Sequence, residues 1–458
     1  MLSKKSRQMK IMILNIDDLI PENHLLKRLD EAISFDFIYE YMQPYYSNNG
    51  RPSIDPVCLI KMLLVGYLYG INSERRLVEE VKLNIAYRWF CNFDFDQKIP
   101  DHSVFSQNRI RRFKDNKIYE DIFHKLVMDC IEKGIVTGEN VVADGSYIPG
   151  NVSPSSKIEV VETVEKSITH YLDEIDMELK SLKGYKDPKI VEIEKMKLTS
   201  SNDLDSGYIY QKNKKGLGYL CEATVDTKNG IITGVDCYPA NKSESEIILK
   251  HVKKQKETLG LNIKNIALDA GYDVGAVHRG FELLDIVDYC ATKDIHNTHS
   301  KKGIIYDTQN DRFICINGKS IHFDRIRLRK GKGFRSEYTM SKKECVGCEF
   351  HKECKINNNS RISITSSPFA NALYKNRNRK ETDKYFEMKR LRSIWAEGTF
   401  AAMKLNHNLK RHRKRGIAKA TEECLLSAIA LNLKRMVNAI QTTFAFLCSY
   451  EIGRLYAR

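Results

Sequence analysis

The 458-residue sequence predicts an α/β protein with an all-α N-terminal domain and a mixed-sheet core that carries two insertions. Up to about residue 135, apolar runs follow residues that cap helices, as at Asp55-Pro56. From residue 139, short β-rich runs alternate with amphipathic stretches. A change of this kind indicates a helical domain followed by a sheet with helices packed on it.

Helices in the N-terminal region are expected to begin at three sets of capping residues: Asp55-Pro56, Asn72-Ser73-Glu74 and Asp101-His102-Ser103. The third helix carries Arg109, Arg111 and Arg112, which we expect to bind DNA. Such a helix is compatible with a helix-turn-helix-like DNA reader. The connection from Cys91 to Pro100 is longer than the tight turn of that motif, so a plain all-α domain is the alternative.

Strands of the core are predicted at residues 140–146, 218–225, 231–237, 265–269 and 286–291, with helices at 243–254 and 275–284. The second and third strands flank Asn229-Gly230, and both residues tolerate the positive φ of a type I′ hairpin turn. Strand, hairpin, helix, strand, helix, strand is the order expected of a ribonuclease H-like core.

Two insertions interrupt this core. Residues 157–198 are charged, and their apolar positions recur at three- and four-residue steps, which predicts a helical hairpin. Residues 295–380 are rich in Lys, Asn and Ser, with short β-like pieces and four cysteines. The predicted division is a helical DNA-binding domain at 1–135, the core at 136–294 and 381–440 with a helical insertion at about 155–200, a Cys-containing insertion at 295–380, and a C-terminal tail at 441–458.

Three acidic residues occupy positions suited to phosphoryl transfer. Asp144 and Asp269 each end an apolar run, and Glu397 lies in a later stretch of helical character. Two carboxylates at strand ends and one on a helix can converge on two divalent cations that hold a phosphodiester. Their hard oxygen atoms suit Mg²⁺ or Mn²⁺. A turn cap is the alternative for any one aspartate, whereas the three in this order favour the metal site.

The charge balance favours a nucleic-acid partner. With 74 Lys and Arg against 59 Asp and Glu, the formal net charge is +15. Lys404 lies two helical turns beyond Glu397 and is expected on the same side of the helix. A basic run then follows, and we expect its side chains to contact the DNA backbone: Lys410, Arg411, Arg413, Lys414 and Arg415. A solvated basic face is the alternative interpretation.

The cysteines admit two interpretations. Cys315, Cys345, Cys348 and Cys354 could supply four thiolate ligands to a small structural zinc knuckle, or they could be reduced thiols of a β-insertion. The other eight cysteines are scattered singly and are expected in the core. The longest apolar run, residues 57–71, contains Lys61 and is shorter than the ~20 residues that cross a bilayer, so no membrane partner and a cytoplasmic location are expected.

Several of these segments together resemble a DDE transposase of a bacterial insertion sequence. The segments are residues 52–113 with Pro100-Asp101-His102-Ser103, then Ala143-Asp144-Gly145-Ser146, Leu268-Asp269-Ala270-Gly271-Tyr272, and residues 394–404 followed by the basic run and 423–436. The resemblance covers nearly all of the chain. It implies an enzyme that binds the terminal inverted repeats of its element, nicks the ends and joins the 3′-OH to target DNA, as a homodimer or larger assembly at the nucleoid. A domesticated metal-dependent nuclease, or a catalytically silent DNA-binding regulator of the same fold, is the alternative.

One motif departs from the resemblance. Relatives often show a Tyr, an Arg four residues before the Glu and a Lys seven residues after it. Lys404 is in place here, but position 393 is Ser and position 390 is Arg rather than Tyr. Arg390 and Arg392 are therefore expected to supply the charge that faces the DNA phosphates. Trp395 is expected to pack in the core, with stacking on an unpaired base as the alternative.

Overall fold

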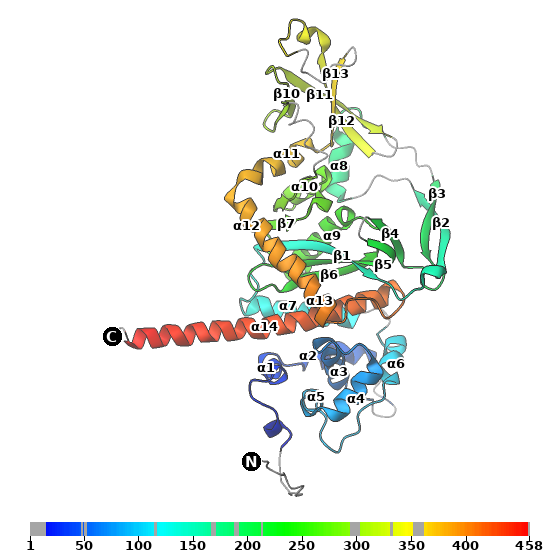
Figure 1. The fold of residues 1–458 in the computed structure, drawn as a ribbon, viewed down its shortest axis with the longest axis vertical. Coiled ribbons are helices and arrows are strands. Elements are labelled where there is room, and N and C mark those ends of the chain that lie inside the picture. Colours follow the sequence, from blue (N-terminus) through cyan, green and yellow to red (C-terminus); the bar gives the residue numbers. More distant parts are fainter. Residues whose placement is uncertain are drawn as a thin grey trace, which may run out of the picture.

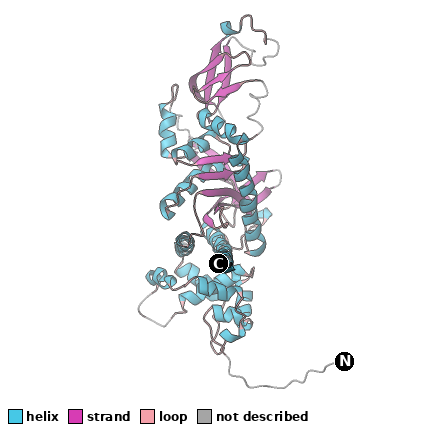
Figure 2. Cartoon of the chain, turned by 90° about the vertical axis from the view of Figure 1, so that its left-hand side faces the viewer, coloured by secondary structure: helices cyan, strands magenta, loops and turns pink. Residues whose placement is uncertain are grey.

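The computed structural model describes residues 15–46, 49, 53–113, 117–165, 171–186, 192–211, 214–293, 303–329, 333–350 and 361–456. Three parts follow one another along the long axis of the molecule. The N-terminal helices lie at one end, a mixed sheet covered by helices lies in the middle, and a second sheet lies at the far end (Figures 1 and 2). A long C-terminal helix crosses the molecule between the first two parts (Figure 1).

The N-terminal part is all helical, as predicted. Its helices are α1 (Leu25–Ala32), α2 (Phe37–Met42), α3 (Pro56–Leu68), α4 (Glu74–Leu83), α5 (Ile85–Phe90), α6 (Ser103–Arg111) and α7 (Lys117–Glu132). The expected caps are present: Asp55 Oδ1 accepts from the Val57 amide at 2.7 Å, and Asp101 Oδ1 accepts from the Ser103 amide at 2.9 Å. Helix α3 is buried from Val57 to Leu68, so the longest apolar run of the chain is a core helix.

The central sheet has the strand order of a ribonuclease H-like fold. Its strands are β1 (Asn140–Pro149), β4 (Gly207–Gln211), β5 (Lys214–Asp226), β6 (Ile232–Pro239), β7 (Asn265–Leu268) and β8 (Val287–Cys290). They run in the order β4-β5-β1-β7-β8, and β6 also pairs with β5. Strand β5 is antiparallel to β1 and β6, whereas β7 is parallel to β1 and β8. Helices α9 (Glu244–Leu259) and α10 (Gly275–Leu283) complete the predicted order.

The β5–β6 hairpin forms where it was expected, but its turn is not type I′. A type I′ turn needs positive φ at both central residues, and Gly230 alone of the Asn229-Gly230 pair has it, at 74°. The Asp226 amide donates to the Ile231 carbonyl, and Asp226 Oδ1 accepts from the Lys228 amide. The Asp226 side chain therefore stabilises a longer loop.

The first insertion is not the predicted helical hairpin. It contains the antiparallel strands β2 (Lys157–Glu165) and β3 (Glu192–Ser200), with one short helix, α8 (Asp173–Ser181), between them. Residues 160–164 include three valines and a threonine, whose β-branched side chains favour strands. That preference outweighs the three- and four-residue spacing of the apolar positions, which α8 alone uses to bury Ile175 and Leu179.

The second insertion forms a separate antiparallel sheet. Its strands are β9 (Ile305–Asp307), β10 (Arg312–Ile314), β11 (Ser320–Arg329), β12 (Gly333–Ser341) and β13 (Arg361–Ser366). Tyr306, Phe313, Tyr338 and Tyr374 form an aromatic core whose ring centroids lie 4.4–6.2 Å apart. Helix α11 (Ala370–Asn378) then leads the chain back to the central sheet (Figure 1).

The C-terminal part is helical. Helix α12 (Asp383–Arg392) continues through a π-helical turn (Ser393–Glu397) into α13 (Gly398–Asn406), and α14 (Ile417–Tyr456) follows after a loop. Helix α14 packs against β6, α7 and α3. It runs without a break past residue 441, where the C-terminal tail was expected to begin. Within the residues that the structure describes, no helix is both long and apolar enough to cross a membrane.

Candidate active site

The pairing of β1 with β7 places two of the predicted carboxylates side by side. These strands are parallel, with Cα partners from Asn140 and Asn265 to Val142 and Ala267. Asp144 and Asp269 each follow the last paired residues by two positions, so they leave the same edge of the sheet at the same level. Asp269 follows the end of β7, as predicted. Asp144 does not end a strand, because β1 continues to Pro149 along β5.

Arg392 brings the third carboxylate into the same group. Its Nη2 atom lies 3.2 Å from Asp144 Oδ1 and 3.9 Å from Asp269 Oδ2, and its Nη1 atom lies 3.6 Å from Glu397 Oε1. The Asp144 and Arg392 side chains are 17% and 18% exposed, whereas that of Glu397 is 62% exposed. The three acidic residues therefore converge on one cation at a site that opens to solvent.

The π-helical turn explains why the basic residue stands at an unexpected spacing. In an α-helix, the residue four positions before Glu397 would share its side, and that residue is Ser393. The turn from Ser393 to Glu397 is π-helical, with hydrogen bonds between residues five apart. Arg392, five positions before Glu397, therefore faces the carboxylates. Arg390 is exposed instead.

Two further acidic side chains lie at the site, and the sequence interpretation missed both. A Cβ atom added to Gly145 would lie 2.7 Å from Glu244 Oε1 and 2.9 Å from Glu222 Oε2. A Cβ atom added to Gly271 would lie 2.9 Å from Glu244 Oε2. The glycines that follow Asp144 and Asp269 thus leave the space that Glu244 occupies. Gly145, directly after Asp144, and Gly271, two residues after Asp269, were the sequence signal for a close neighbour.

Glu222 is the buried member of this group. It is fully buried on β5, and the Tyr272 hydroxyl donates to its Oε1 atom at 2.6 Å. Burial raises the pKa of Glu222 well above its ordinary value, and the charges of Glu244, Asp144 and Asp269 act in the same direction. Its Oε2 atom is buried without a hydrogen-bond partner. Burial therefore favours the protonated form of Glu222.

Lys404 and Trp395 fix the helices that carry Glu397. Lys404 Nζ donates to Ser146 Oγ at 2.7 Å, two residues beyond Asp144 on β1, so it reaches the same side of the sheet as Glu397. Trp395 covers Gly230, where an added Cβ atom would overlap the indole ring. The Arg435 guanidinium lies 5.4 Å from the centroid of that ring. These contacts agree with the packing role expected for Trp395.

Two family models match the chain. One is a transposase domain, DUF772, over residues 14–111, and the other is a transposase DDE domain over residues 314–437. The chain therefore carries a transposase DDE domain. The second match contains Glu397. None of the curated proteins compared with the chain matches it.

Among solved structures, the chain is similar to a piggyBac transposase in a synaptic complex with hairpin DNA. The two share 9% identity at a TM-score of 0.35, over 91% of this chain and 78% of that one. It is also similar to the Mos1 mariner paired-end complex with Mn, at 10% identity and a TM-score of 0.16, over 57% of this chain and 65% of that one.

Most side chains of the predicted DNA-binding basic run make ion pairs or hydrogen bonds within the protein. Lys414 Nζ lies 2.7 Å from Glu422 Oε1, and Arg413 Nε lies 3.4 Å from Glu423 Oε1, and both glutamates are 1% exposed. Arg411 and Arg415 donate hydrogen bonds to the backbone carbonyls of residues 150 to 152. Lys410 is exposed. The solvated-face alternative is therefore wrong for Arg413 and Lys414, because these two side chains are structural.

The arginines in and directly after α6 also differ from one another, since some are paired within the protein and one is exposed. Arg109 is 10% exposed and lies 2.5 Å from Glu74 Oε1 and 2.7 Å from Glu422 Oε1. It joins the N-terminal helices to α14 rather than facing solvent. The Arg112 guanidinium lies 4.2 Å from the centroid of the Tyr46 ring. Arg111 is exposed.

A basic cleft lies between the N-terminal helices and the loop before α14. Its volume is about 760 Å³. Its lining residues come from α4, α6, the loop after β1 and the basic run: Asn72, Ser73, Glu74, Arg75, His102, Ser106, Arg109, Ile110, Asn151, Arg413, Lys414, Arg415 and Lys419. Six of these are Arg or Lys and one is acidic, which gives the cleft a positive field.

The predicted zinc cysteines lie on the second insertion. Cys315 and Cys345 pack against its aromatic core, and Asn317 Nδ2 lies 3.5 Å from Cys348 Sγ. All three are half-buried. Cys354 lies outside the described residues.

Proposed function

We propose that this transposase binds the terminal inverted repeats of a mobile element, nicks DNA at the element ends and transfers the 3′-OH to target DNA. The observation that carries the proposal is the convergence of Asp144, Asp269 and Glu397 on one cation at an open edge of the sheet. Hard carboxylate oxygens from three separate segments form a donor set that fits Mg²⁺ or Mn²⁺.

Asp144, Asp269 and Glu397 would hold two such ions, and Glu244, which lies beside Gly145 and Gly271, would be a further ligand. When bound, a pair of these ions activates the attacking oxygen and stabilises the departing 3′-oxygen. Glu222 borders the site, where burial favours its protonated form and so limits the negative charge beside the other carboxylates.

Other residues of the chain would bind and orient the DNA. Lys404 is held beside β1 on the same side as Glu397, from where its ammonium group can reach a phosphate at the site. Arg392 has the charge and position to do the same once the carboxylates bind metal. The basic cleft and the exposed Arg111, Arg390 and Lys410 offer contacts to the duplex backbone away from the cleavage point.

We further propose that two copies act together, because two element ends must be cut and joined in one reaction. Such an enzyme would work at the nucleoid. For the second insertion we propose a structural zinc ion at Cys315, Cys345, Cys348 and Cys354, since four thiolates leave no open coordination position.

The test is cleavage and joining of labelled element-end DNA with Mg²⁺ and with Mn²⁺. We expect Asp144→Asn, Asp269→Asn and Glu397→Gln each to abolish nicking while leaving end-DNA binding nearly intact, because an amide keeps the shape but loses the charge that binds metal. Glu244→Gln should slow nicking less severely. Glu387→Gln, at an exposed position of α12, is the matched control.

Wild-type nicking by any of the three carboxylate variants would refute the assignment of the site. Nicking without joining by the unmodified chain would favour a domesticated nuclease, and binding without nicking would favour a silent regulator.

A further inference from the structure

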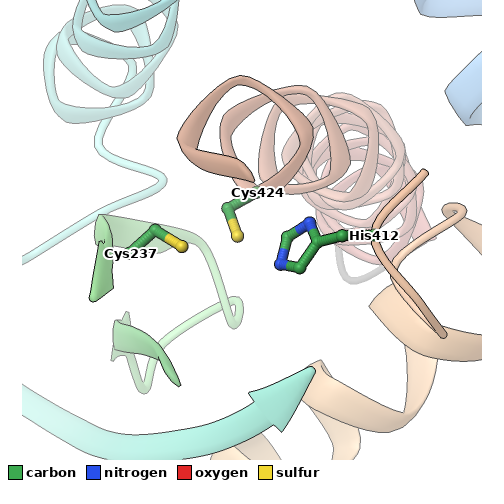
Figure 3. A group of neighbouring side chains, drawn as sticks. All are labelled: Cys237, His412 and Cys424. Carbon is green, nitrogen blue, oxygen red and sulfur yellow. The ribbon is translucent and has the colours of Figure 1, made fainter. Parts of the chain in front are cut away.

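A second group of metal-binding side chains lies inside the molecule, away from the carboxylates. One ligand atom from each of Cys237, His412 and Cys424 lies within 4.8 Å of the other two. Cys237 is on β6, Cys424 is on α14, and His412 is on the loop that precedes α14. Figure 3 shows the two sulfur atoms and one edge of the imidazole pointing toward one another. The three residues are 9%, 1% and 0% exposed in the order of the chain.

A further thiol, that of Cys221, lies next to this group of three. Cys221 is the Cα partner of Cys237 in the β5–β6 ladder, so the two side chains lie on the same face of the sheet. Its thiol is hydrogen bonded to that of Cys424. Cys221 is fully buried. Cys221 is therefore the candidate for a fourth ligand beside Cys237, His412 and Cys424.

His412 is oriented as a metal-binding histidine is. Its Nδ1 atom lies 2.9 Å from Glu423 Oε2, and the imidazole also interacts with the Cys424 thiol. The ring packs edge-on against Tyr219, with centroids 5.3 Å apart, and the His412 amide donates to the Pro149 carbonyl. A carboxylate on one ring nitrogen fixes the tautomer that leaves the other nitrogen free for a metal. The observation that points to a ligand is the grouping of the Cys237, His412 and Cys424 ligand atoms within 4.8 Å of one another.

We propose that Cys221, Cys237, Cys424 and His412 bind a structural zinc ion. Three sulfurs and one nitrogen form a tetrahedral donor set that zinc prefers, and four protein ligands leave no position for water or substrate. Binding would release the protons of the coordinating thiols to solvent, while Nδ1–H of His412 donates to Glu423. Burial raises the pKa of the Cys237 thiol, and the charge of the cation would reverse that effect.

The ion would join parts of the fold that position DNA-facing residues. It would connect the β5–β6 hairpin, next to β1, with α14 and with the loop that holds Arg411, Arg413 and Lys414. That loop follows α13, whose Lys404 contacts β1. Loss of the ion should therefore loosen the basic cleft, and it should weaken DNA binding without changing any ligand of the carboxylate site.

The test is zinc content, measured by elemental mass spectrometry on the full chain purified under reducing conditions without chelator. Cys348→Ser is used as the background, so that any zinc held by the second insertion is lost. We expect about one zinc per chain in this background, and loss of that zinc on adding Cys237→Ser or Cys424→Ser. Cys130→Ser, at an equally buried thiol of α7, is the matched control and should keep it.

A spectroscopic measurement on the Cys348→Ser chain tests the site even if the Cys237→Ser and Cys424→Ser variants fail to fold. Cobalt taken up in place of zinc should give thiolate-to-metal charge-transfer absorption and the intense visible bands of a tetrahedral site. X-ray absorption of the zinc form should show Zn–S distances of about 2.3 Å and a Zn–N distance of about 2.0–2.1 Å. Absence of zinc from the Cys348→Ser chain, or equal zinc in its Cys424→Ser and Cys130→Ser derivatives, would overturn the proposal.

Discussion

The carboxylate site and the charged network under α14 are built from the same types of charged side chain, but their charge balance differs. At the carboxylate site, Asp144, Asp269 and Glu397 lie around Arg392, and Glu244 and Glu222 lie beside Gly145. Under α14, three glutamates meet four basic groups: Glu74, Glu422 and Glu423 with Arg109, Arg413, Lys414 and His412. The first group has an excess of negative charge that an external cation can neutralise. The second is balanced inside the protein, so it stabilises the fold.

The largest expected effect comes from breaking the balanced network. Arg109→Met should lower the free energy of unfolding by about 3–5 kcal/mol, because it leaves Glu74 and the buried Glu422 with one cation fewer. Urea denaturation measures this change. Arg76→Ala, which removes the exposed pair with Glu80, should change it little. Equal shifts in the two variants would mean that the network contributes nothing to stability.

A second balanced group, in which His278 and Arg379 pair with Asp273 and Asp288, supports the loop after Asp269, and it predicts a pH effect. His278 lies 3.0 Å from Asp273 Oδ1 and 2.5 Å from Asp288 Oδ2. Burial alone would lower the pKa of His278, but the two aspartates raise it to about 9. Because the folded pKa exceeds the unfolded value of about 6.5, this stabilisation is complete below pH 6.5 and is lost as the pH rises toward 9.

The loss should be on the order of 3 kcal/mol in the free energy of unfolding between these two pH values. Urea denaturation at pH 6.5 and pH 9 measures it, and His278→Gln should show a smaller pH dependence than the unmodified chain. An unchanged dependence in that variant would assign the effect to other groups.

Substitution of Arg392 allows the metal affinity of the carboxylate site to be tested. If its guanidinium competes with metal for the carboxylates, Arg392→Gln should tighten Mn²⁺ binding in the absence of DNA, on the order of tenfold or about 1.4 kcal/mol. Calorimetric titration with Mn²⁺ measures the affinity, with the exposed Arg390→Gln as control. Weaker binding in Arg392→Gln would show instead that the arginine holds the carboxylates in place.

The smallest effect is expected where basic side chains are neither paired nor buried. Lys410→Gln with Lys419→Gln should leave the free energy of unfolding unchanged, because both side chains are exposed. The plot of log K for duplex binding against log salt should flatten by about 0.9 for each DNA phosphate that the variant no longer neutralises. An unchanged slope would exclude both lysines from the DNA interface.

The sequence predicted the features that depend on neighbours along the chain. Helix caps such as Asp55 and the strand before Asp269 could be recognised in this way. The spacing of 125 between Asp144 and Asp269 is also the register offset of β1 and β7, but the register had to be seen before the number had meaning. The β2–β3 hairpin was missed because its apolar spacing fits a helix while its β-branched residues favour a strand.

The thiol group could not be predicted from the hairpin alone. Counting outward from the turn, Val225 pairs with Ile232, which would place Cys221 opposite Asp236. An irregularity between Thr224 and Val225 shifts the ladder by one residue and brings Cys221 opposite Cys237. Similarly, nothing in the chain indicates that the first turn of α9 faces the sheet edge, so Glu244 was overlooked.

The π-helical turn before Glu397 has a consequence for how such helices tolerate insertions. A wide turn absorbs one extra residue while the helix continues on both sides of it. The residues after the turn keep their orientation toward the sheet. The side chain that contacts Glu397 is then Arg392 instead of Ser393. A single-codon insertion or deletion at this point can therefore exchange the residue that meets the carboxylates without displacing the carboxylates themselves.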